Sequence, residues 1–246
     1  MSRTQFPITL VDSQEIAPGV RHFTFTTTQT TPFSFIPGQF INLHFPVNGE
    51  TLQRSYSIAT LPHEGNNTIE LALSHVSGGR ASGYLFNLPI GHTVDASGPF
   101  GRLVLREDET PKRYILVSTG TGVTPYRAML PALAQRMQTH GTQVVVLLGA
   151  RSPGELLYQD EFLSFMSRHP LFSFYGCCSR VRSDPERTHE RKGYVQETFA
   201  ELALTPGEDI VYLCGNPHMV DQAYQVLLDV GFEKHGVRRE KYVFSH

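Results

Sequence analysis

The chain is poor in cysteine, because only Cys177, Cys178 and Cys214 occur among its 246 residues. A plant-type two-iron, two-sulfur centre requires four cysteine ligands, so this chain cannot hold one by itself. Any iron–sulfur carrier that it serves must be a separate protein. Cys177 and Cys178 are adjacent, with Cα atoms about 3.8 Å apart, which is closer than a relaxed disulfide prefers. We interpret them as buried apolar side chains at a strand end, with a redox dithiol as the less favoured alternative.

The sequence also lacks long apolar runs and a strong net charge. No stretch approaches the roughly 18 apolar residues of a membrane span, and the segment from Met1 to Pro7 lacks the apolar core of a signal peptide. A formal net charge of −2 gives no general attraction to nucleic acid or anionic lipid. We therefore expect a monomeric cytoplasmic protein that has neither nucleic acid nor membrane as a partner.

The first part of the chain alternates between apolar and polar residues and is punctuated by turn signals such as Pro37-Gly38 and Asn48-Gly49. This pattern predicts short antiparallel strands that close into a small β-barrel. The expected strands are Ile8–Gln14, Arg21–Thr27, Gln39–Phe45, Arg54–Ile58 and Ile69–Val76, followed by a helix over Ala81–Asn87.

Beyond the polar connector Arg102–Lys112, apolar strands alternate with helices, which predicts a doubly wound parallel sheet. The expected strands are Tyr114–Thr119, Gln143–Gly149, Leu171–Cys177 and Asp209–Cys214, and the expected helices are Val123–Gln138, Glu155–Ser167, Tyr194–Ala203 and Pro217–Val230. The sequence therefore predicts an antiparallel β-barrel domain over residues 1–104 and an α/β domain over residues 105–246.

Two motifs in the barrel region carry groups that suit a flat aromatic ligand with phosphates. Arg54 and Tyr56 are two residues apart, so they point the same way off a strand; a guanidinium can contact a phosphate and a ring can lie on a ring. In Gly78-Gly79-Arg80-Ala81-Ser82 the glycines permit a close backbone approach and Ser82 adds a hydroxyl. Alone, each motif is more simply an ordinary strand or turn. Their combination, followed by Gly98-Pro99-Phe100-Gly101, favours a ligand site.

A third motif, Gly120-Thr121-Gly122-Val123-Thr124-Pro125, lies between an expected strand and an expected helix. Glycines there let a pyrophosphate approach, and a helix N-terminus favours its negative charge. The spacing differs from the G-x-G-x-x-G of dinucleotide-binding Rossmann domains.

In this order and at these distances, together with Cys214-Gly215-Asn216-Pro217, the motifs resemble those of the ferredoxin (flavodoxin)–NADP reductase family, bacterial type, over nearly the whole chain. The resemblance implies an FAD-binding barrel, an NADP(H)-binding α/β domain and no metal site. It also implies electron exchange between NADP(H) and a separate ferredoxin or flavodoxin.

The resemblance implies a set of FAD contacts from the barrel and from the C-terminal segment. They are Arg54, Ser55, Tyr56, Ser57, Leu73, Ser74, His75, Val76, Gly79, Arg80, Ala81 and Ser82, with Tyr242 or Phe244 covering the outer face of the flavin. By register we favour Tyr242 as the covering ring. An exposed tyrosine on an edge strand is the alternative.

For NADP(H), the resemblance implies contacts from Gly120, Thr121, Gly122, Thr124, Pro125, Arg151, Ser179, Arg180, Lys192, Tyr194, Gln196, Cys214, Gly215, Asn216 and Pro217. Ser179, Arg180 and Lys192 resemble a pocket for the 2′-phosphate, and Tyr194 a platform for adenine. Arg151 is a further candidate for the phosphate. Arg182, Arg187 and Arg191 are interpreted as solvated loop residues.

The same resemblance makes Ser57, Cys214, Glu240 and Tyr242 the expected catalytic residues. Cys214 would lie beside the nicotinamide ring and Glu240 would help to move protons. A lone cysteine that ends an apolar strand usually serves packing, so only its context promotes Cys214.

Two other functions use the same features. One is an NADH-dependent reductase that serves an oxygenase or free flavin, and the other is a non-catalytic flavin or NADPH sensor or electron-transfer subunit.

Acidic carriers could be attracted by basic residues, for which the candidates are Arg102, Arg106, Lys112, Arg113, Lys234, Arg238 and Arg239. Ordinary solvated surface is the simpler interpretation of that set.

Overall fold

The computed structural model describes residues 5–27, 32–63, 65, 67–180 and 187–243. Contacts divide the chain into two compact units. The first comprises the chain up to Leu105 together with Thr124–Met129, and the second comprises Arg106–Val123 and Leu130–Val243. Each unit has its own sheet, and each is described by itself below.

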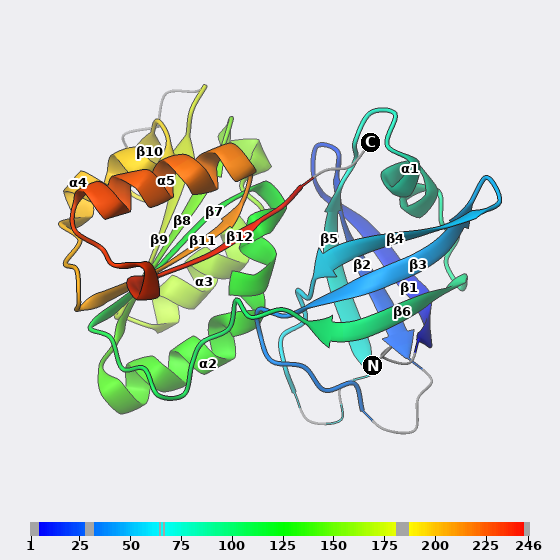
Figure 1. The fold of residues 1–246 in the computed structure, drawn as a ribbon, viewed down its shortest axis with the longest axis horizontal. Coiled ribbons are helices and arrows are strands. Elements are labelled where there is room, and N and C mark those ends of the chain that lie inside the picture. The colour runs from blue at the N-terminus through cyan, green and yellow to red at the C-terminus, as the bar shows by residue number, and fades with distance from the viewer. Residues whose placement is uncertain (1–4, 28–31, 64, 66, 181–186, 244–246) are drawn as a thin grey trace. The chain divides into compact units, whose positions relative to one another are not determined.

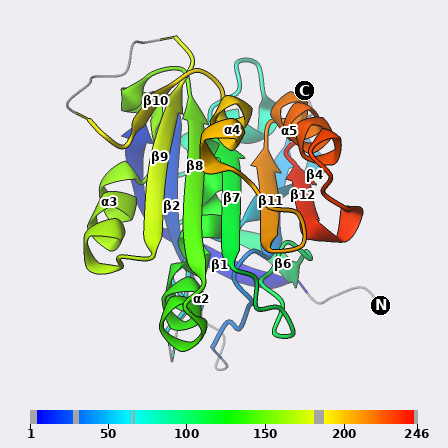
Figure 2. The ribbon, with the colours of Figure 1, turned by 90° about the vertical axis from the view of Figure 1, so that its left-hand side faces the viewer.

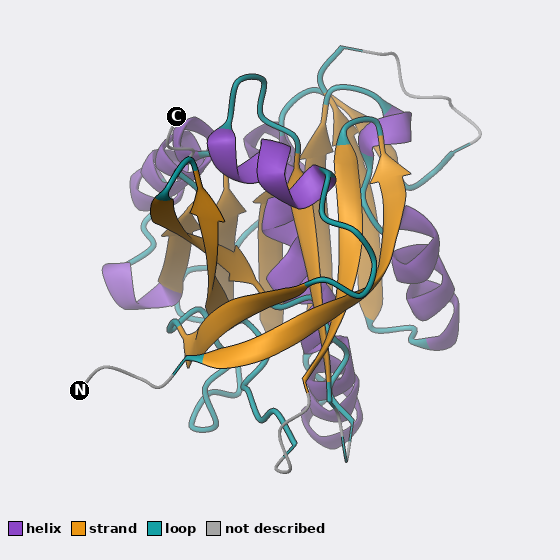
Figure 3. Cartoon of the chain, turned by 90° about the vertical axis from the view of Figure 1, so that its right-hand side faces the viewer, coloured by secondary structure: helices purple, strands orange, loops and turns teal. Residues whose placement is uncertain are grey.

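The first unit is a closed antiparallel barrel with one short helix (Figure 3). Its elements are β1 (Phe6–Ala17), β2 (Val20–Thr27), β3 (Phe40–Val47), β4 (Glu50–Ser57), β5 (Thr68–Ser74), α1 (Arg80–Phe86) and β6 (Thr93–Phe100). The strand order is β4-β3-β6-β1-β2-β5, and an antiparallel bridge between Ile58 and Leu71 joins the two edges. The barrel expected from the sequence is therefore confirmed.

Alternation of side chains builds the interior of this barrel. Along β2, Phe23 and Phe25 are buried while the residues between and beside them are partly exposed. Ile8, Leu43 and Leu71 enter the same core from three other strands. Since successive side chains of a strand point to opposite faces, one apolar face per strand suffices to fill the barrel.

The second unit is a parallel sheet with helices on both faces (Figures 1 and 2). Its strands are β7 (Arg113–Thr119), β8 (Gln143–Ala150), β9 (Phe172–Cys178), β10 (Glu190–Lys192), β11 (Asp209–Gly215) and β12 (Val237–Lys241). Its helices are α2 (Thr124–His140, of which the part from Leu130 onward belongs to this unit), α3 (Gln159–Arg168), α4 (Phe199–Leu202) and α5 (Pro217–Asp229). Short 3-10 turns are η1 (Gly120–Val123), η2 (Pro153–Glu155), η3 (Val195–Thr198) and η4 (Lys234–Gly236).

Side chains of β9 show how both faces of this sheet are covered. Phe174 packs on Phe162 of α3, with ring centroids 5.2 Å apart. The next residues on the opposite face, Tyr175 and Cys177, belong to the core under α5, which includes Ala223. Strands covered on both faces become apolar throughout, as the expected strands of this region are.

The strand order β10-β9-β8-β7-β11-β12 places the switch of direction between β7 and β11. From β7 the chain moves outward through β8, β9 and β10, and β11 then returns to the other side of β7. In such sheets, ligands bind at the carboxyl ends of the strands that flank the switch. The predicted doubly wound sheet is confirmed, and it directs attention to Thr119 and Cys214.

Several elements differ from the expectation. The helix expected over Tyr194–Ala203 is two short pieces, η3 and α4, which end where Ala203 has a φ of 46°. The helix expected from Glu155 begins at Gln159, because Tyr158 has a left-handed backbone. Strands β6, β10 and β12 were not among the expected elements. Gly98-Pro99 within β6 has the composition of a turn, and β10 has only three residues.

None of the helices within the described ranges combines the length and the apolar character that a membrane crossing requires.

Candidate functional site

On β4 of the barrel unit, Arg54 and Tyr56 lie on one face, since both are half-buried while Ser55 between them is exposed. Burial raises the pKa of the Tyr56 hydroxyl, and the nearby Arg54 charge opposes that rise. Ser57 is buried at the end of the strand. Ser55 donates a hydrogen bond to the Asn42 side chain at 2.6 Å on the neighbouring strand. The pair predicted to hold a phosphate and a ring thus shares one surface.

The predicted flavin contacts from Leu73 to Val76 lie beside the Arg54 motif because the barrel closes there. The bridge between Ile58 and Leu71 sets the end of β4 against β5, which continues through Leu73 and Ser74 to His75 and Val76. Leu73 is buried, and His75 is exposed with its ring edge on Phe86. Two segments that are separated in sequence therefore meet at one barrel seam.

In the loop before α1, the Ser82 hydroxyl is already engaged. It accepts a hydrogen bond from the Val76 N–H at 3.0 Å and lies within donating distance of the Val76 and Gly79 carbonyl oxygens. A Cβ on Gly79 would meet the Ser82 Oγ at 2.8 Å and the Val76 Cβ at 2.9 Å, so glycine is required for this close packing. The hydroxyl that Ser82 supplies therefore shapes the loop before α1.

Arg80 and Ala81 point toward the barrel as well. The Arg80 guanidinium forms an ion pair with Glu50 at 2.9 Å, and Ala81 packs against the barrel core. Neither side chain is held by the other predicted flavin residues.

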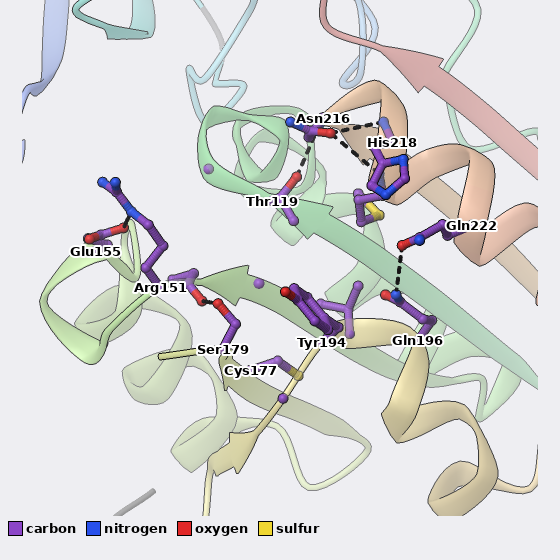
Figure 4. A pocket seen from close by; sticks show the side chains of 16 residues that line it. Thr119, Arg151, Glu155, Cys177, Ser179, Tyr194, Gln196, Asn216, His218 and Gln222 are labelled. Atoms are coloured by element: carbon purple, nitrogen blue, oxygen red, sulfur yellow. Dashed lines mark hydrogen bonds and ion pairs between the residues drawn. The ribbon is translucent and has the colours of Figure 1, made fainter. Parts of the chain in front are cut away.

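The α/β unit contains a cavity of about 390 Å³ at the carboxyl ends of β7, β8 and β9, beside the start of α5 (Figure 4). It is lined by Thr119, Gly120, Gly149, Ala150, Arg151, Glu155, Cys177, Ser179, Gly193, Tyr194, Val195, Gln196, Asn216, His218, Met219 and Gln222. Such a position next to the switch of strand direction is where this sheet type binds ligands.

The turn after β7 fits against the end of β11 only because Gly122 has no side chain. A Cβ on Gly122 would lie 2.6 Å from the Cys214 carbonyl carbon and 2.7 Å from the Gly215 Cα. Thr121 and Gly122 are buried in η1, and Thr124 with Pro125 begins α2. The Thr124 hydroxyl oxygen is buried, with no hydrogen-bond partner among the described residues. The predicted pyrophosphate turn therefore has a tight backbone and an uncommitted hydroxyl.

Asn216 links the two strand ends that flank the switch. Its backbone N–H donates to the Thr119 hydroxyl at 3.1 Å, and its side-chain oxygen caps α5 by accepting from the His218 and Met219 N–H groups. Pro217 follows as the first residue of α5. Cap residues of this kind satisfy the free N–H groups of a first helical turn.

The candidate 2′-phosphate residues gather where β8 and β9 end. The Ser179 N–H donates to the Ala150 carbonyl at 3.1 Å, and the Arg180 N–H donates to the Arg151 carbonyl at 3.0 Å. Arg151 and Ser179 line the cavity, with Tyr194 close by and 61% exposed (Figure 4). Arg180 and Lys192 are exposed beside it and do not line it.

Gln196 lies deeper in the cavity. Its amide nitrogen donates to the Gln222 side-chain oxygen at 3.1 Å, whereas its own oxygen is buried with no partner within the described chain. A buried acceptor of this kind is costly unless a ligand or water completes it.

Strands β11 and β12 and the residue after β12 carry three of the four predicted catalytic residues: Cys214, Glu240 and Tyr242. Cys214 of β11 pairs in register with Glu240 of β12, and the Tyr242 N–H donates to the Gly215 carbonyl at 2.8 Å. Burial and the Glu240 charge raise the pKa of the Cys214 thiol, against a hydrogen bond with Tyr242. Burial also raises the pKa of Glu240 to about 7. Phe244, the other candidate for the covering ring, lies outside the described residues.

Known domain families match both units. Residues 7–105 match the oxidoreductase FAD-binding domain, and residues 116–225 match the oxidoreductase NAD-binding domain. Ferredoxin–NADP reductase B of Sorangium cellulosum is 34% identical over 245 residues, which cover 96% of this chain and 97% of that protein. The chain belongs to the ferredoxin–NADP reductase family.

Some relatives of this chain are named as components of oxygenase systems. The toluate 1,2-dioxygenase electron transfer component of Pseudomonas putida is 31% identical over 213 residues, which cover 86% of this chain and 60% of that relative. A ferredoxin–NADP reductase from Neisseria gonorrhoeae with bound FAD and NADP has a TM-score of 0.83 at 23% identity, covering 96% of this chain and 98% of that one. This structural likeness shows the fold of the reductase family.

Sequence reasoning missed several residues that line the cavity of the α/β unit. Thr119, Glu155, His218, Met219 and Gln222 line it but belong to none of the recognised motifs. Thr119 directly precedes the glycine motif, and His218 directly follows the Cys-Gly-Asn-Pro turn. Extending each motif by one residue would therefore have included both. Glu155 and Gln222 carried none, because only the fold brings them to the cavity.

The structure corrects part of the predicted basic patch. Arg238 has a side chain only 9% exposed and forms an ion pair with Glu109. Arg113 donates to both carboxylate oxygens of Asp209, at 2.8 and 2.6 Å. These two arginines bind within the α/β unit and are not free surface charges.

Proposed function

We propose that this chain is a flavoenzyme that exchanges electrons, through FAD, between NADP(H) and a separate one-electron carrier, a ferredoxin or a flavodoxin. The observation that carries the proposal is the grouping of Arg151, Ser179 and Tyr194 at the cavity, with the backbone of Arg180 bonded to that of Arg151. A cation, a hydroxyl and an aromatic ring just beyond the carboxyl ends of β8, β9 and β10 suit a phosphorylated ribose and its adenine. Belonging to the family supports the cofactor pair FAD and NADP(H).

The residues of both units fit these cofactors. Gly122 leaves room for a backbone turn that can approach a pyrophosphate, and the uncommitted Thr124 and Gln196 oxygens can meet ligand groups. In the barrel, Arg54 and Tyr56 share one half-buried face that suits a phosphate and a ring. Bound FAD would accept a hydride and release electrons singly, which links NADPH to a one-electron carrier.

The protein's own contribution is to bind, orient and hold a proton. Cys214 remains a neutral thiol at physiological pH because burial raises its pKa, so it serves as a small polarisable surface. Glu240, with a pKa of about 7, changes its proton occupancy near neutral pH and is our candidate for holding a proton close to Cys214. Ser57 and Tyr242 complete the proposed catalytic set.

Stopped-flow reduction of the flavin-loaded protein by NADPH and by NADH tests the proposal. We expect NADPH to be preferred by about 10²- to 10⁴-fold, since two charge-assisted contacts to a phosphate contribute roughly 1.5–3 kcal/mol each. Replacing Arg151, which lines the cavity, by alanine should weaken NADPH binding while leaving NADH binding unchanged. Arg187→Ala is the control, because that side chain pairs with Glu190 and does not line the cavity. Protein that retains no FAD would refute the proposal.

A second function is an NADH-dependent reductase component of an oxygenase. Two observations favour it: relatives such as the toluate dioxygenase component and the phenol 2-monooxygenase reductase component of a Pseudomonas strain, and the acidic Glu155 at the cavity. A preference for NADH in the same experiment would select this function. A non-catalytic sensor or inert subunit would fail to reduce ferricyanide with either coenzyme.

The proposed carrier is acidic and acts in the cytoplasm with a monomeric reductase. Lys234 and Arg239 remain exposed candidates for attracting it. Reduction of an acidic carrier should then slow as ionic strength rises, because screening weakens long-range attraction.

A further inference from the structure

Arg151 is not alone at the edge of the cavity. Its Nε donates to the Glu155 Oε2 at 2.9 Å, and both side chains line the cavity (Figure 4). The Arg151 side chain is 60% exposed and that of Glu155 is 26% exposed. Arg151 directly follows β8, and Glu155 closes η2, so a short connection holds the two together.

The ion pair lies next to the residues proposed for the 2′-phosphate. The Ser179 N–H and hydroxyl both approach the Ala150 carbonyl, at 3.1 and 3.4 Å, and the Arg180 N–H bonds to Arg151. A phosphate that contacts Arg151 meets a guanidinium whose Nε already donates to Glu155. The carboxylate competes with the phosphate for this guanidinium, and the two negative groups repel each other.

We propose that Glu155 is a specificity-determining residue that lowers the preference of this chain for NADPH over NADH. The inference rests on the proposed function, because it concerns the same coenzyme cavity. Glu155 penalises a phosphorylated ribose, and with NADH its carboxylate is free to accept a hydrogen bond from the 2′-hydroxyl, as acidic residues do in other dinucleotide sites. The basic and acidic members of the pair thus act in opposite directions.

The main alternative gives Glu155 a supporting role, in which it holds Arg151 in place for the phosphate. The two roles predict opposite signs. If Glu155 competes, its neutral analogue binds NADPH more tightly; if Glu155 supports, the same variant binds NADPH more weakly.

The test measures dissociation constants of NADP⁺ and NAD⁺, and of the fragments 2′,5′-ADP and 5′-ADP, with the flavin-loaded protein. Glu155→Gln should lower the dissociation constants of NADP⁺ and 2′,5′-ADP by about threefold to tenfold. This change corresponds to a free energy within or just above the range measured for exposed ion pairs. NAD⁺ and 5′-ADP should bind equally well or more weakly. High salt should reduce this gain in affinity, because the charged groups are partly exposed and salt screens them.

Two further variants isolate the cause. Glu208→Gln is the matched control, since Glu208 forms a comparable exposed pair with Lys112 at 3.0 Å and does not line the cavity. This variant should leave the dissociation constants of NADP⁺ relative to NAD⁺, and of 2′,5′-ADP relative to 5′-ADP, unchanged. In an Arg151→Gln background, Glu155→Gln should give a smaller gain, because no guanidinium remains to be released.

Weaker NADP⁺ binding by Glu155→Gln, or an equal change for both coenzymes, would overturn the inference. These results differ from failure of the proposed function, which would show as NADH preference in the unaltered protein. If the unaltered protein prefers NADH and Glu155→Gln still tightens 2′,5′-ADP, the role of Glu155 stands while the proposed function falls.

Discussion

Glu240 shows how the setting of one side chain changes its chemistry. Burial raises the pKa of its carboxyl from 4.5 to about 7, and its register partner is the buried Cys214. Between these two pKa values, the folded protein binds a proton that the unfolded chain lacks. The contribution of Glu240 to stability is therefore present below about pH 4.5 and is lost as pH rises toward 7.

We expect Glu240→Gln to remove the loss of folding stability that Glu240 causes as pH rises. At pH 8 the variant should be more stable than the unaltered protein by up to about 2–3 kcal/mol, and near pH 4.5 the difference should vanish. Thermal unfolding of flavin-loaded protein across this pH range measures the effect, with Glu208→Gln as an exposed control. Parallel stability profiles for Glu240→Gln and the unaltered protein would contradict the assignment.

Among the elements at the site, the turn between β7 and α2 is held by close backbone packing. Gly122 lies against the carbonyl group of Cys214, so the η1 turn packs on the end of β11 without a side chain between them. This contact holds the predicted pyrophosphate turn at the end of β11. It depends on packing between elements that are far apart in sequence.

Gly122→Ala should lower the free energy of unfolding by about 1–3 kcal/mol, the usual cost of overpacking. It should also weaken coenzyme binding, since the turn must shift. Gly154→Ala is the matched control, because its added Cβ would have no neighbour within 4 Å. Urea unfolding with both variants measures the difference, and equal midpoints would show that the loop relaxes freely.

Elements were predictable where local pattern sufficed. The continuous apolar runs of β7, β8 and β11 identified a covered parallel sheet, and alternation identified the strands of the barrel. Strand β10 was missed because three residues carry too little pattern, and its place is decided by pairing with β9. The helix expected over Tyr194–Ala203 is helical from Val195 to Leu202, but its first half is the 3-10 turn η3 and only its second half is α-helical.

At the scale of the whole molecule, each unit has its own core and its own sheet, and the chain passes through both. Tyr242 follows β12 and is bonded through its backbone to Gly215. Family resemblance assigns its ring to the flavin face. If that role holds, nicotinamide must displace the ring before hydride transfer.

Tyr242→Gly should then tighten binding of both coenzymes, and of NADH more than NADPH, so that selectivity falls. Because the coenzyme no longer has to displace a stacked ring, its affinity should rise by up to about tenfold. Equilibrium titration of NADP⁺ and NAD⁺ measures it, and Tyr242→Phe is the control that keeps the ring. Unchanged affinities in the glycine variant would exclude Tyr242 as the covering residue.

The sequence by itself determined the fold class, the family and the chemistry of the cofactors. Periodicity and glycine motifs are local properties, so they can be recognised before any long-range contact is known. Only the tertiary structure decided that Arg151 faces Glu155, that Ser82 is engaged inside its own loop, and that Arg238 is buried against Glu109. Charges and hydroxyls acquire their roles from neighbours that packing supplies, and those neighbours are distant in sequence or carry no recognisable motif.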